Sequence, residues 1–359
     1  MATFDALAAL PIEIEGYELE DMDRTYGDFT RPSTVVHLRG GGEEGVGEDV
    51  VYDELDHIAH RDAGAVQDLT GHATLGEFCE FVGELDLFPD SPPVREFSRL
   101  YRRWAYESAA LDLALRQGGI PLHEALGREP KPLTFVCSTR LSAFPAEGEE
   151  KAPSNIEPVT NRLAKYPGTR FKVDPENDWT DELIAELKGA AGVDVLDLKG
   201  HYKGTPVDVV TDPELYRKVA EAFPDAWIED PDINEETRPV LEPYADRITW
   251  DAPLHYLSDI KELERKPKAI NSKPSRFGSL KEICAIYDYC AEEGIQIYSG
   301  GQGEVGPGRG QAQYLSSLFH PDSSNDIAPS GYNDPSVPDG LPTSPMDPVP
   351  SPTGFRWGE

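Results

Sequence analysis

Three acidic residues in the middle of the chain follow one another at regular intervals. Asp197, Glu229 and Asp251 each close a short stretch with β-strand character, and Lys172 and Lys273 close the stretches before and after them. Successive members of this series are 25, 32, 22 and 22 residues apart, which is the length of one strand–helix repeat. Because the carboxyl ends of parallel strands meet at one face, we expect the five side chains to converge.

Carboxylates that converge from neighbouring strands suit a hard cation. Mg²⁺ takes few protein carboxylates and keeps coordination positions for water and substrate. Zn²⁺ would favour His or Cys, and the series contains neither. The sequence therefore predicts Mg²⁺ as the cofactor, with Asp197, Glu229 and Asp251 as its ligands.

The elements that position these residues alternate from about residue 132 onward. Eight strand-like stretches, most of them separated by helical patterns, imply parallel strands with right-handed crossovers. They predict a (β/α)8 TIM barrel whose last helix is weak or missing, with a doubly wound open sheet as the structural alternative. The predicted strands are 133–141, 169–174, 193–198, 226–230, 247–251, 269–273, 295–299 and 326–330, and the main helices are 155–165, 181–190, 213–223, 235–244, 279–293 and 311–319.

The segments that flank this repeat have a different character. Residues 1–125 contain strand patterns followed by helical ones, the strongest at 94–117, which predicts an α+β unit before a barrel at 126–332. Residues 333–359 are rich in proline and lack periodicity. Because they end with Phe355 and Trp357, we expect an ordered segment that returns to the N-terminal unit.

The composition restricts the partners and the compartment. Asp and Glu number 66 against 33 Lys and Arg, a formal net charge of −33 that repels nucleic acid and anionic lipid. No apolar run approaches the roughly 20 residues of a membrane span, and the N-terminus lacks the pattern of a signal peptide. The four cysteines form no Cys-x-x-Cys pair, which is typical of reduced thiols in a cytoplasmic protein.

The excess of acidic residues has two interpretations that the sequence leaves open. A highly charged surface keeps a halophile's protein hydrated in concentrated salt, whereas the simpler reading is an acidic bacterial enzyme. A melting temperature that does not rise between low and molar KCl would exclude the first.

Three segments carry a resemblance to a known family. They are 104–114 (WAYESAALDLA), 227–231 (WIEDP) and 271–278 (NSKPSRFG), in this order and around the spacing given above. On these residues the sequence resembles the enolase superfamily, within its muconate-lactonizing-enzyme and mandelate racemase group. The muconate-lactonizing type fits better, because the eight histidines show no clear His–Asp dyad at the sixth and seventh strands. The resemblance covers nearly the whole chain and implies that residues 1–125 form a capping domain.

The resemblance also implies a reaction. Mg²⁺ would bind a substrate carboxylate, a base would remove the α-proton, and the metal would stabilise the enediolate. Such a proton is weakly acidic, so its removal requires a fixed cation and a base of tuned pKa. Lys172 and Lys273 would be these acid–base groups, and two lysines on opposite faces permit racemisation, epimerisation, cycloisomerisation or syn elimination.

Several residues depart from the family pattern or compete within it. Arg170 replaces the first lysine of a Lys-x-Lys motif and would stay positive near the substrate carboxylate. Asp174 competes with Asp197 as the first ligand, and the strand count favours Asp197. Lys199 stands where much of the family has asparagine; it would be an extra acid, a carboxylate clamp or a surface lysine.

Other signals concern substrate binding and its alternatives. The loop at 24–31 holds Tyr26, which we expect to close over the substrate, and Arg309 would reach an anionic group. The G-x-G-x-x-G match at 301–306 precedes Pro307, so we interpret it as a glycine-rich loop and not as a dinucleotide site. His57 and His60 lie on one helix face, and we expect both at the surface.

We therefore expect an enzyme of the lyase or isomerase type that acts on a small-molecule carboxylate, and a homo-oligomer. Two alternatives remain at this stage. One is an aldolase that forms a Schiff base on Lys273. The other is a family member that binds a ligand without catalysis.

Overall fold

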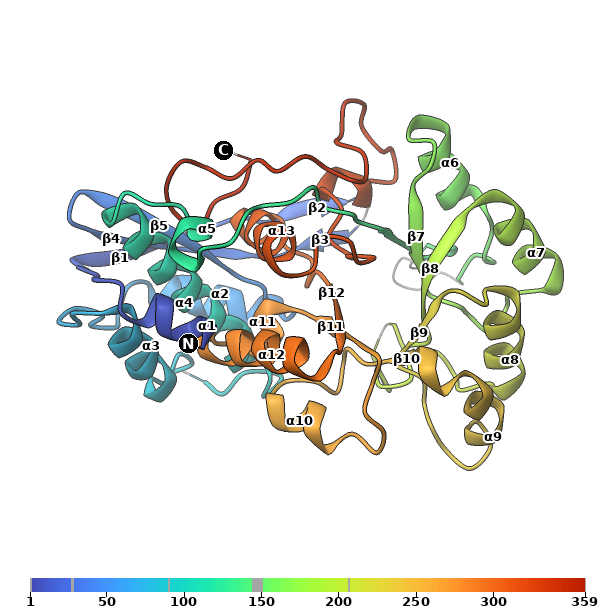
Figure 1. Ribbon diagram of the computed structural model, residues 1–359. Coiled ribbons are helices and arrows are strands. Elements are labelled where there is room, and N and C mark those ends of the chain that lie inside the picture. The colour runs from blue at the N-terminus through green and yellow to red at the C-terminus, as the bar shows by residue number, and fades with distance from the viewer. Residues whose placement is uncertain (1, 27–28, 90, 144–150, 206, 359) are drawn as a thin grey trace.

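The computed structural model describes residues 2–26, 29–89, 91–143, 151–205 and 207–358 (Figure 1). An N-terminal layer of strands and helices lies beside a ring of strands and helices from the later part of the chain. Nowhere in these ranges is a helix both long and apolar enough to cross a membrane.

The N-terminal unit is a three-stranded antiparallel sheet in the order β1-β4-β5, covered by helices. Gly41 and Gly42, at φ values of 57° and 78°, form the two-residue turn between β4 and β5. A separate hairpin, β2–β3, follows β1. The elements are α1 (Thr3–Ala8), β1 (Gly16–Asp21), β2 (Arg24–Tyr26), β3 (Phe29–Arg31), β4 (Thr34–Gly40), β5 (Glu43–Asp49), α2 (Glu54–Ala63) and α3 (Leu75–Glu84).

The long helix α4 (Ser98–Gln117) packs directly on β5. A Cβ at Gly47 would lie 2.0 Å from the Ala105 carbonyl oxygen, so only glycine lets the helix approach this closely. The predicted start at Val94 was wrong by four residues. The Val94 amide is held by the Asp56 carboxylate at 3.3 Å, and the helix begins after this contact.

The predicted barrel is present, with some of its strands shortened. Five parallel strands lie in the order β10-β9-β8-β7-β6, and a second parallel pair is β11-β12. They are β6 (Cys137–Thr139), β7 (Arg170–Val173), β8 (Gly192–Asp197), β9 (Trp227–Glu229), β10 (Ile248–Thr249), β11 (Ala269–Ser272) and β12 (Gln296–Ser299).

Backbone hydrogen bonds close these two sheets into a ring. The Asn271 amide donates to the Trp250 carbonyl at 3.0 Å, which joins β10 to β11. Single bridges join Asn325 to Phe135, just before β6, and Asp326 to Gly300, just after β12, in place of the predicted strand 326–330. The fold class is therefore confirmed, whereas the eighth strand is reduced to these bridges and is followed by a 3₁₀ turn, η2 (Ser330–Asn333).

Helices connect the strands on the outside of the ring (Figure 1). The predicted helix 235–244 is split into a short α-helix and a 3₁₀ turn, η1 (Glu242–Arg247). The helices are α5 (Leu122–Leu126), α6 (Glu157–Lys165), α7 (Asp181–Ala190), α8 (Pro213–Ala222), α9 (Arg238–Leu241), α10 (Leu257–Glu262), α11 (Pro274–Phe277), α12 (Leu280–Glu293) and α13 (Pro307–Phe319).

The proline-rich C-terminal segment is ordered over its described residues and contacts α4. Phe355 is fully buried, and its ring packs edge-on against Trp104 with centroids 6.5 Å apart. Asp112 accepts hydrogen bonds from the Phe355 amide at 2.7 Å and from Arg356 Nε at 2.9 Å. The segment thus runs back to the N-terminal unit.

Candidate functional site

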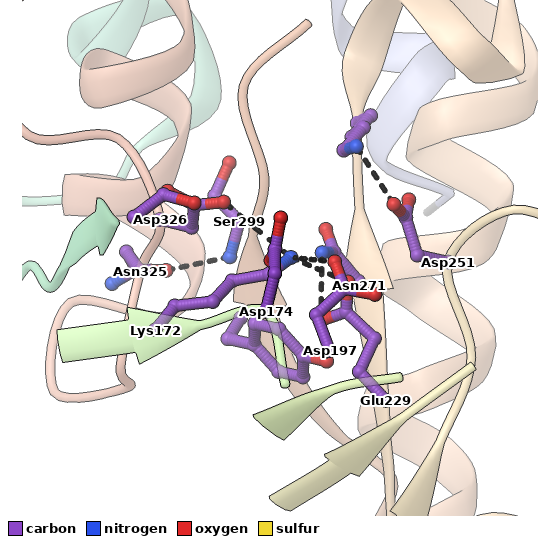
Figure 2. Close-up of polar contacts among 12 residues, drawn as sticks. Lys172, Asp174, Asp197, Glu229, Asp251, Asn271, Ser299, Asn325 and Asp326 are labelled. Atoms are coloured by element: carbon purple, nitrogen blue, oxygen red, sulfur yellow. Dashed lines mark hydrogen bonds and ion pairs between the residues drawn. The ribbon is translucent and has the colours of Figure 1, made fainter. Parts of the chain in front are cut away.

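Neighbouring barrel strands bring the predicted carboxylates and one lysine together. Asp197 ends β8 and Glu229 ends β9, and the two are direct register partners. Lys172 reaches them from β7, and all three side chains are buried (Figure 2). The convergence expected from the strand spacing is therefore present for these three residues.

Lys172 is surrounded by negative charge. Its Nζ lies 3.1 Å from Asp197 Oδ2 and 3.5 Å from Asp326 Oδ2, and it is in close contact with Glu229 Oε1. Burial acts to lower the pKa of Lys172, but Asp197 and Glu229 outweigh burial and raise that pKa well above its ordinary value. Without a further cation, Lys172 is therefore a protonated acid.

Lys273 pairs with a different carboxylate. Its Nζ lies 2.7 Å from Asp251 Oδ2, and the hydroxyl of Tyr202 donates to the same oxygen at 3.2 Å. Gly300 makes room for this lysine, because a Cβ there would lie 2.6 Å from Lys273 Cε. Lys172 and Asp251, the partner of Lys273, lie on opposite sides of Glu229 in Figure 2.

The carboxylates best placed to share a cation differ by one residue from the predicted set. Asp197, Glu229 and Asp230 offer ligand oxygens that all lie within 4.8 Å of one another, and all three are buried. Asp251 is outside this group, since its carboxylate faces Lys273 and, at 3.6 Å, Arg276.

Asp230 was missed because its backbone breaks the alternation of a strand. In an extended strand, neighbouring side chains point to opposite faces, so Glu229 and Asp230 would not share a site. Asp230 instead has a φ of 49°, in the left-handed region that a non-glycine residue adopts only at a cost. Its oxygens accept hydrogen bonds from the amides of Asp251 and Ala252, each at 2.8 Å.

The charge balance of the site fits a divalent cation. Among the residues described here, six carboxylates gather around four cationic side chains, so the ionised group carries two excess negative charges. Burial, followed by the neighbouring carboxylates, raises the pKa of Glu229 to about 8 and that of Asp230 to about 7. The carboxylates are Asp174, Asp197, Glu229, Asp230, Asp251 and Asp326, and the cations are Lys172, Lys199, Lys273 and Arg276.

These raised pKa values predict that the metal-free protein loses stability as the pH rises from 6.5 to 8.5. Glu229 has a native pKa of about 8 against an ordinary value of 4.5, so in this range the native state holds a proton that the unfolded chain has lost. Raising the pH removes that proton, which costs roughly 1–2 kcal/mol of unfolding free energy. Saturating Mg²⁺ should abolish the loss, because the ion takes the place of the protons.

Thermal melting in EDTA and in Mg²⁺ at three pH values checks this expectation. Glu229→Gln is the matched variant, since it keeps the side chain's size and cannot titrate. An equal fall with pH in wild type and in this variant would contradict the assignment to Glu229.

Lys199 lies at the edge of the same cluster. Its Nζ is 2.5 Å from Asp197 Oδ2 and 3.5 Å from Asp174 Oδ1, so it bridges the two competing candidates for the first ligand. Its φ of 54° is also left-handed, and this backbone turns the side chain back toward the carboxylates. Lys199 is thus a partly buried member of the cluster, and Asp174 is outside the group of three carboxylates.

Two residues that the sequence did not single out complete the site. Tyr298 donates its hydroxyl to Glu229 Oε2 at 2.5 Å, and Asp326 faces Lys172 from the closing bridge of the barrel. Asp326 is the first residue of a predicted strand, whereas site residues are expected at the carboxyl ends of strands, so its position did not mark it as a site residue. Asn271, from the segment that carried the family resemblance, donates to Glu229 Oε2 at 3.2 Å.

The residues predicted to bind substrate do not all lie beside the carboxylate cluster. Arg170 begins β7, at the opposite end of the strand from the cluster, and pairs with Asp194 while half exposed. The structure thus separates Arg170 from Lys172. Arg309 pairs with Glu304 at 3.2 Å. Burial raises the pKa of Asp326, and the positive charge of Arg309 is one of those that oppose this rise. The side chain of Tyr26 lies outside the described part of the structure.

The expectation that His57 and His60 lie at the surface was wrong. Both rings are buried on the inner face of α2. His57 Nδ1 is 2.9 Å from Thr34 Oγ1, and His60 Nε2 is 2.9 Å from the Tyr106 hydroxyl. These contacts lie within the capping domain, so both histidines are part of its packing.

Two family models match this chain. The N-terminal domain of a domain of unknown function (DUF8230) matches residues 5–125, and the C-terminal domain of the same family matches residues 129–334. The o-succinylbenzoate synthase of Bacillus subtilis (strain 168) is 43% identical over 230 residues. That match covers 59% of this chain and 55% of the relative, so the chain matches little more than half of the relative's length.

Solved structures give the same fold over nearly the whole chain. A member of the enolase superfamily from Roseovarius nubinhibens ISM aligns with a TM-score of 0.66 and 17% identity, over 96% of this chain and 93% of that one. A dipeptide epimerase from Methylococcus capsulatus complexed with Mg ion has a TM-score of 0.65 and 18% identity, over 88% and 90%. The resemblance inferred from the sequence motifs is confirmed: the chain belongs to the DUF8230 family and has the fold of the enolase superfamily.

Proposed function

We propose that this protein is a Mg²⁺-dependent enzyme that removes the proton α to the carboxylate of a small substrate. The observation that carries the proposal is the placement of Lys172 and Lys273 on either side of a buried carboxylate cluster. The o-succinylbenzoate synthase relative and the dipeptide epimerase neighbour support an enzyme of this general type.

The donor set fits Mg²⁺, since it consists of buried carboxylate oxygens. The wider cluster of charged side chains around it carries two excess negative charges when ionised. Asp197 and Glu229 would hold the ion, with the third carboxylate from Asp251, as the sequence predicts, or from Asp230, which lies nearer. When bound, Mg²⁺ would offset the charge that develops on the substrate carboxylate and lower the pKa of Lys172, which these carboxylates now raise.

The chain's own residues would then move the proton. Lys172 Nζ and Lys273 Nζ approach the cluster from different strands, β7 and the end of β11, so each can face a different side of the substrate's α-carbon. Tyr298 and Asn271 orient Glu229, and Tyr202 orients Asp251. Two opposed lysines support racemisation, epimerisation, cycloisomerisation or syn dehydration.

Exchange of the substrate α-proton for deuterium tests the proposal. Incubation in D₂O with Mg²⁺ and a panel of dipeptides, N-acylamino acids, muconate analogues and acid sugars should label at least one compound at the carbon next to its carboxylate. Exhaustive EDTA treatment should stop the labelling, and Mg²⁺ should restore it. Full activity without divalent ions would contradict the proposal. A borohydride-trapped adduct with a keto acid on Lys273 would instead support the aldolase alternative.

A further inference from the structure

The glycine-rich segment 301–308 (GQGEVGPG) runs from just after β12 into the first turn of α13, and residues of the capping domain contact it. Two buried residues of the capping domain with opposite charges, Arg31 and Glu48, contact the backbone of this segment. Arg31 binds its carbonyl oxygens, and Glu48 binds its amide groups. We call this arrangement the interdomain lock.

Arg31 ends the β2–β3 hairpin, and its guanidinium is almost completely buried. The five hydrogen bonds that it makes within the described part of the chain all go to backbone carbonyls, so no carboxylate of that part pairs with its charge. Three of the carbonyls belong to the capping domain and two to the barrel loop. They are Pro32 at 3.0 Å, Val50 and Val51 at 2.6 Å, Gln302 at 3.1 Å and Gly303 at 3.3 Å.

Glu48 makes the complementary contact at the start of α13. Its carboxylate accepts from the amides of Val305, Gly306 and Gly308 at 2.7, 3.0 and 2.9 Å, and from Ser33 Oγ at 2.7 Å. A carboxylate is favoured there, because the first amides of a helix lack partners and carry partial positive charge. The amides that a pyrophosphate would require are thus bound by the protein's own side chain.

Close contact with the capping domain accounts for three glycines of this segment. A Cβ at Gly303, whose φ is 76°, would lie 3.0 Å from Arg31 Nε. A Cβ at Gly306 would lie 2.4 Å from Met22 Sδ, and one at Gly308 would lie 2.9 Å from Glu48 Oε2. The pattern therefore matches a dinucleotide fingerprint because close backbone approach is needed in both cases.

The lock also connects the capping hairpin to the site. Arg31 Cζ lies 4.9 Å from the ring centre of Tyr52, a half-exposed residue just after β5, and Tyr52 packs against Tyr101 of α4. At the other end, Gly300 precedes the locked loop and packs against Lys273 Cε. A shift of the capping domain at Arg31 would thus move strands β2 and β3 relative to the barrel loop that follows Gly300.

We propose that Arg31 and Glu48 are positioning residues, which lock the capping domain onto segment 301–308 and hold strands β2 and β3 in place for substrate capture. The contacts do not depend on the reaction, whereas the effect on substrate capture rests on the proposed function. The two parts can be tested separately.

Hydrogen exchange tests the lock without any substrate. In Arg31→Met, the amides of 302–308 and of 29–31 should exchange at least ~10-fold faster than in wild type, because the two segments lose their shared partner. Arg162→Met is the matched control: Arg162 is also buried and donates to backbone carbonyls, those of Tyr332 and Pro158, which lie outside the capping domain. It should leave these amides within ~2-fold of wild type. Unchanged exchange in Arg31→Met would overturn the lock.

Kinetics with a compound identified by deuterium exchange tests the functional part. Arg31→Met should raise KM at least ~10-fold with kcat changed less than ~3-fold, as expected when uniform binding is lost. Arg31→Lys keeps the positive charge but not the forked donor groups of arginine, so its KM should lie between those of wild type and Arg31→Met. If Arg31→Met does not fold, Gly303→Ala perturbs the same contact from the barrel side and should show the same two effects. A faster exchange with unchanged KM would overturn the role in substrate capture while leaving the lock and the reaction intact.

Discussion

Replacing Lys273 by alanine is expected to stop α-proton exchange from one enantiomer of the substrate, with a loss of at least ~10²-fold, the usual scale for a positioned acid–base group. If Lys172 serves the opposite face, exchange from the other enantiomer should partly survive in this variant, and Lys172→Ala should show the reverse. Deuterium incorporation into each enantiomer measures both. This pattern would identify a racemase or epimerase.

A single active face gives a different pattern. If one lysine is the base and the other only pairs with negative charge, both variants should lose exchange from the same stereoisomer, as expected for syn elimination or cycloisomerisation. Lys266→Ala is the control, because Lys266 is an exposed lysine that pairs with Glu293 at 2.6 Å. A loss of less than tenfold in both Lys172→Ala and Lys273→Ala would place the acid–base groups elsewhere, and Lys199 would be tested next.

Glu229→Gln is expected to weaken Mg²⁺ binding by at least ~10²-fold, more than the loss of a residue that only orients a ligand. Glu229 lies at the centre of the cluster: Asp197 is its register partner, and Lys172, Asn271 and Tyr298 contact its two oxygens. The amide keeps the size of the side chain and removes the charge. Calorimetric titration with Mg²⁺ alone measures the change, and the melting temperature of the loaded protein should fall with it.

Two pairs of variants assign the remaining ligands by the same titration. Asp197→Asn should weaken Mg²⁺ binding more than Asp174→Asn does, and the reverse result would reinstate Asp174 as the first ligand. Asp230→Asn and Asp251→Asn distinguish the third position. If neither weakens binding, Asp197 and Glu229 hold the ion without a third carboxylate, and the proposed ligand set is wrong.

The order and spacing of the chain were sufficient to predict the barrel and the convergence of Lys172, Asp197 and Glu229. Each strand–helix repeat must return the chain to the same end of a parallel sheet, so residues one repeat apart at strand ends meet without further information. The same argument predicted Lys273 and Asp251 near one another, and their side chains form an ion pair at 2.7 Å.

Features that depend on single backbone angles or on distant packing were decided only by the tertiary structure. Asp230 joins the carboxylates because its φ is 49°, and local sequence patterns assume extended strands. Arg170, two residues before Lys172, pairs with Asp194 at the other end of the strand.

Burial and domain contact also arise from residues far apart in the chain. His57 and His60 have the spacing of an exposed helix face, yet they are buried, because Thr34 and Tyr106 supply polar partners from other elements. The segment 301–308 has the pattern of a phosphate-binding loop, but Arg31 and Glu48, more than 250 residues earlier, occupy its polar groups. A local motif reports which backbone conformations are possible, and only the packed fold determines which side chain uses them.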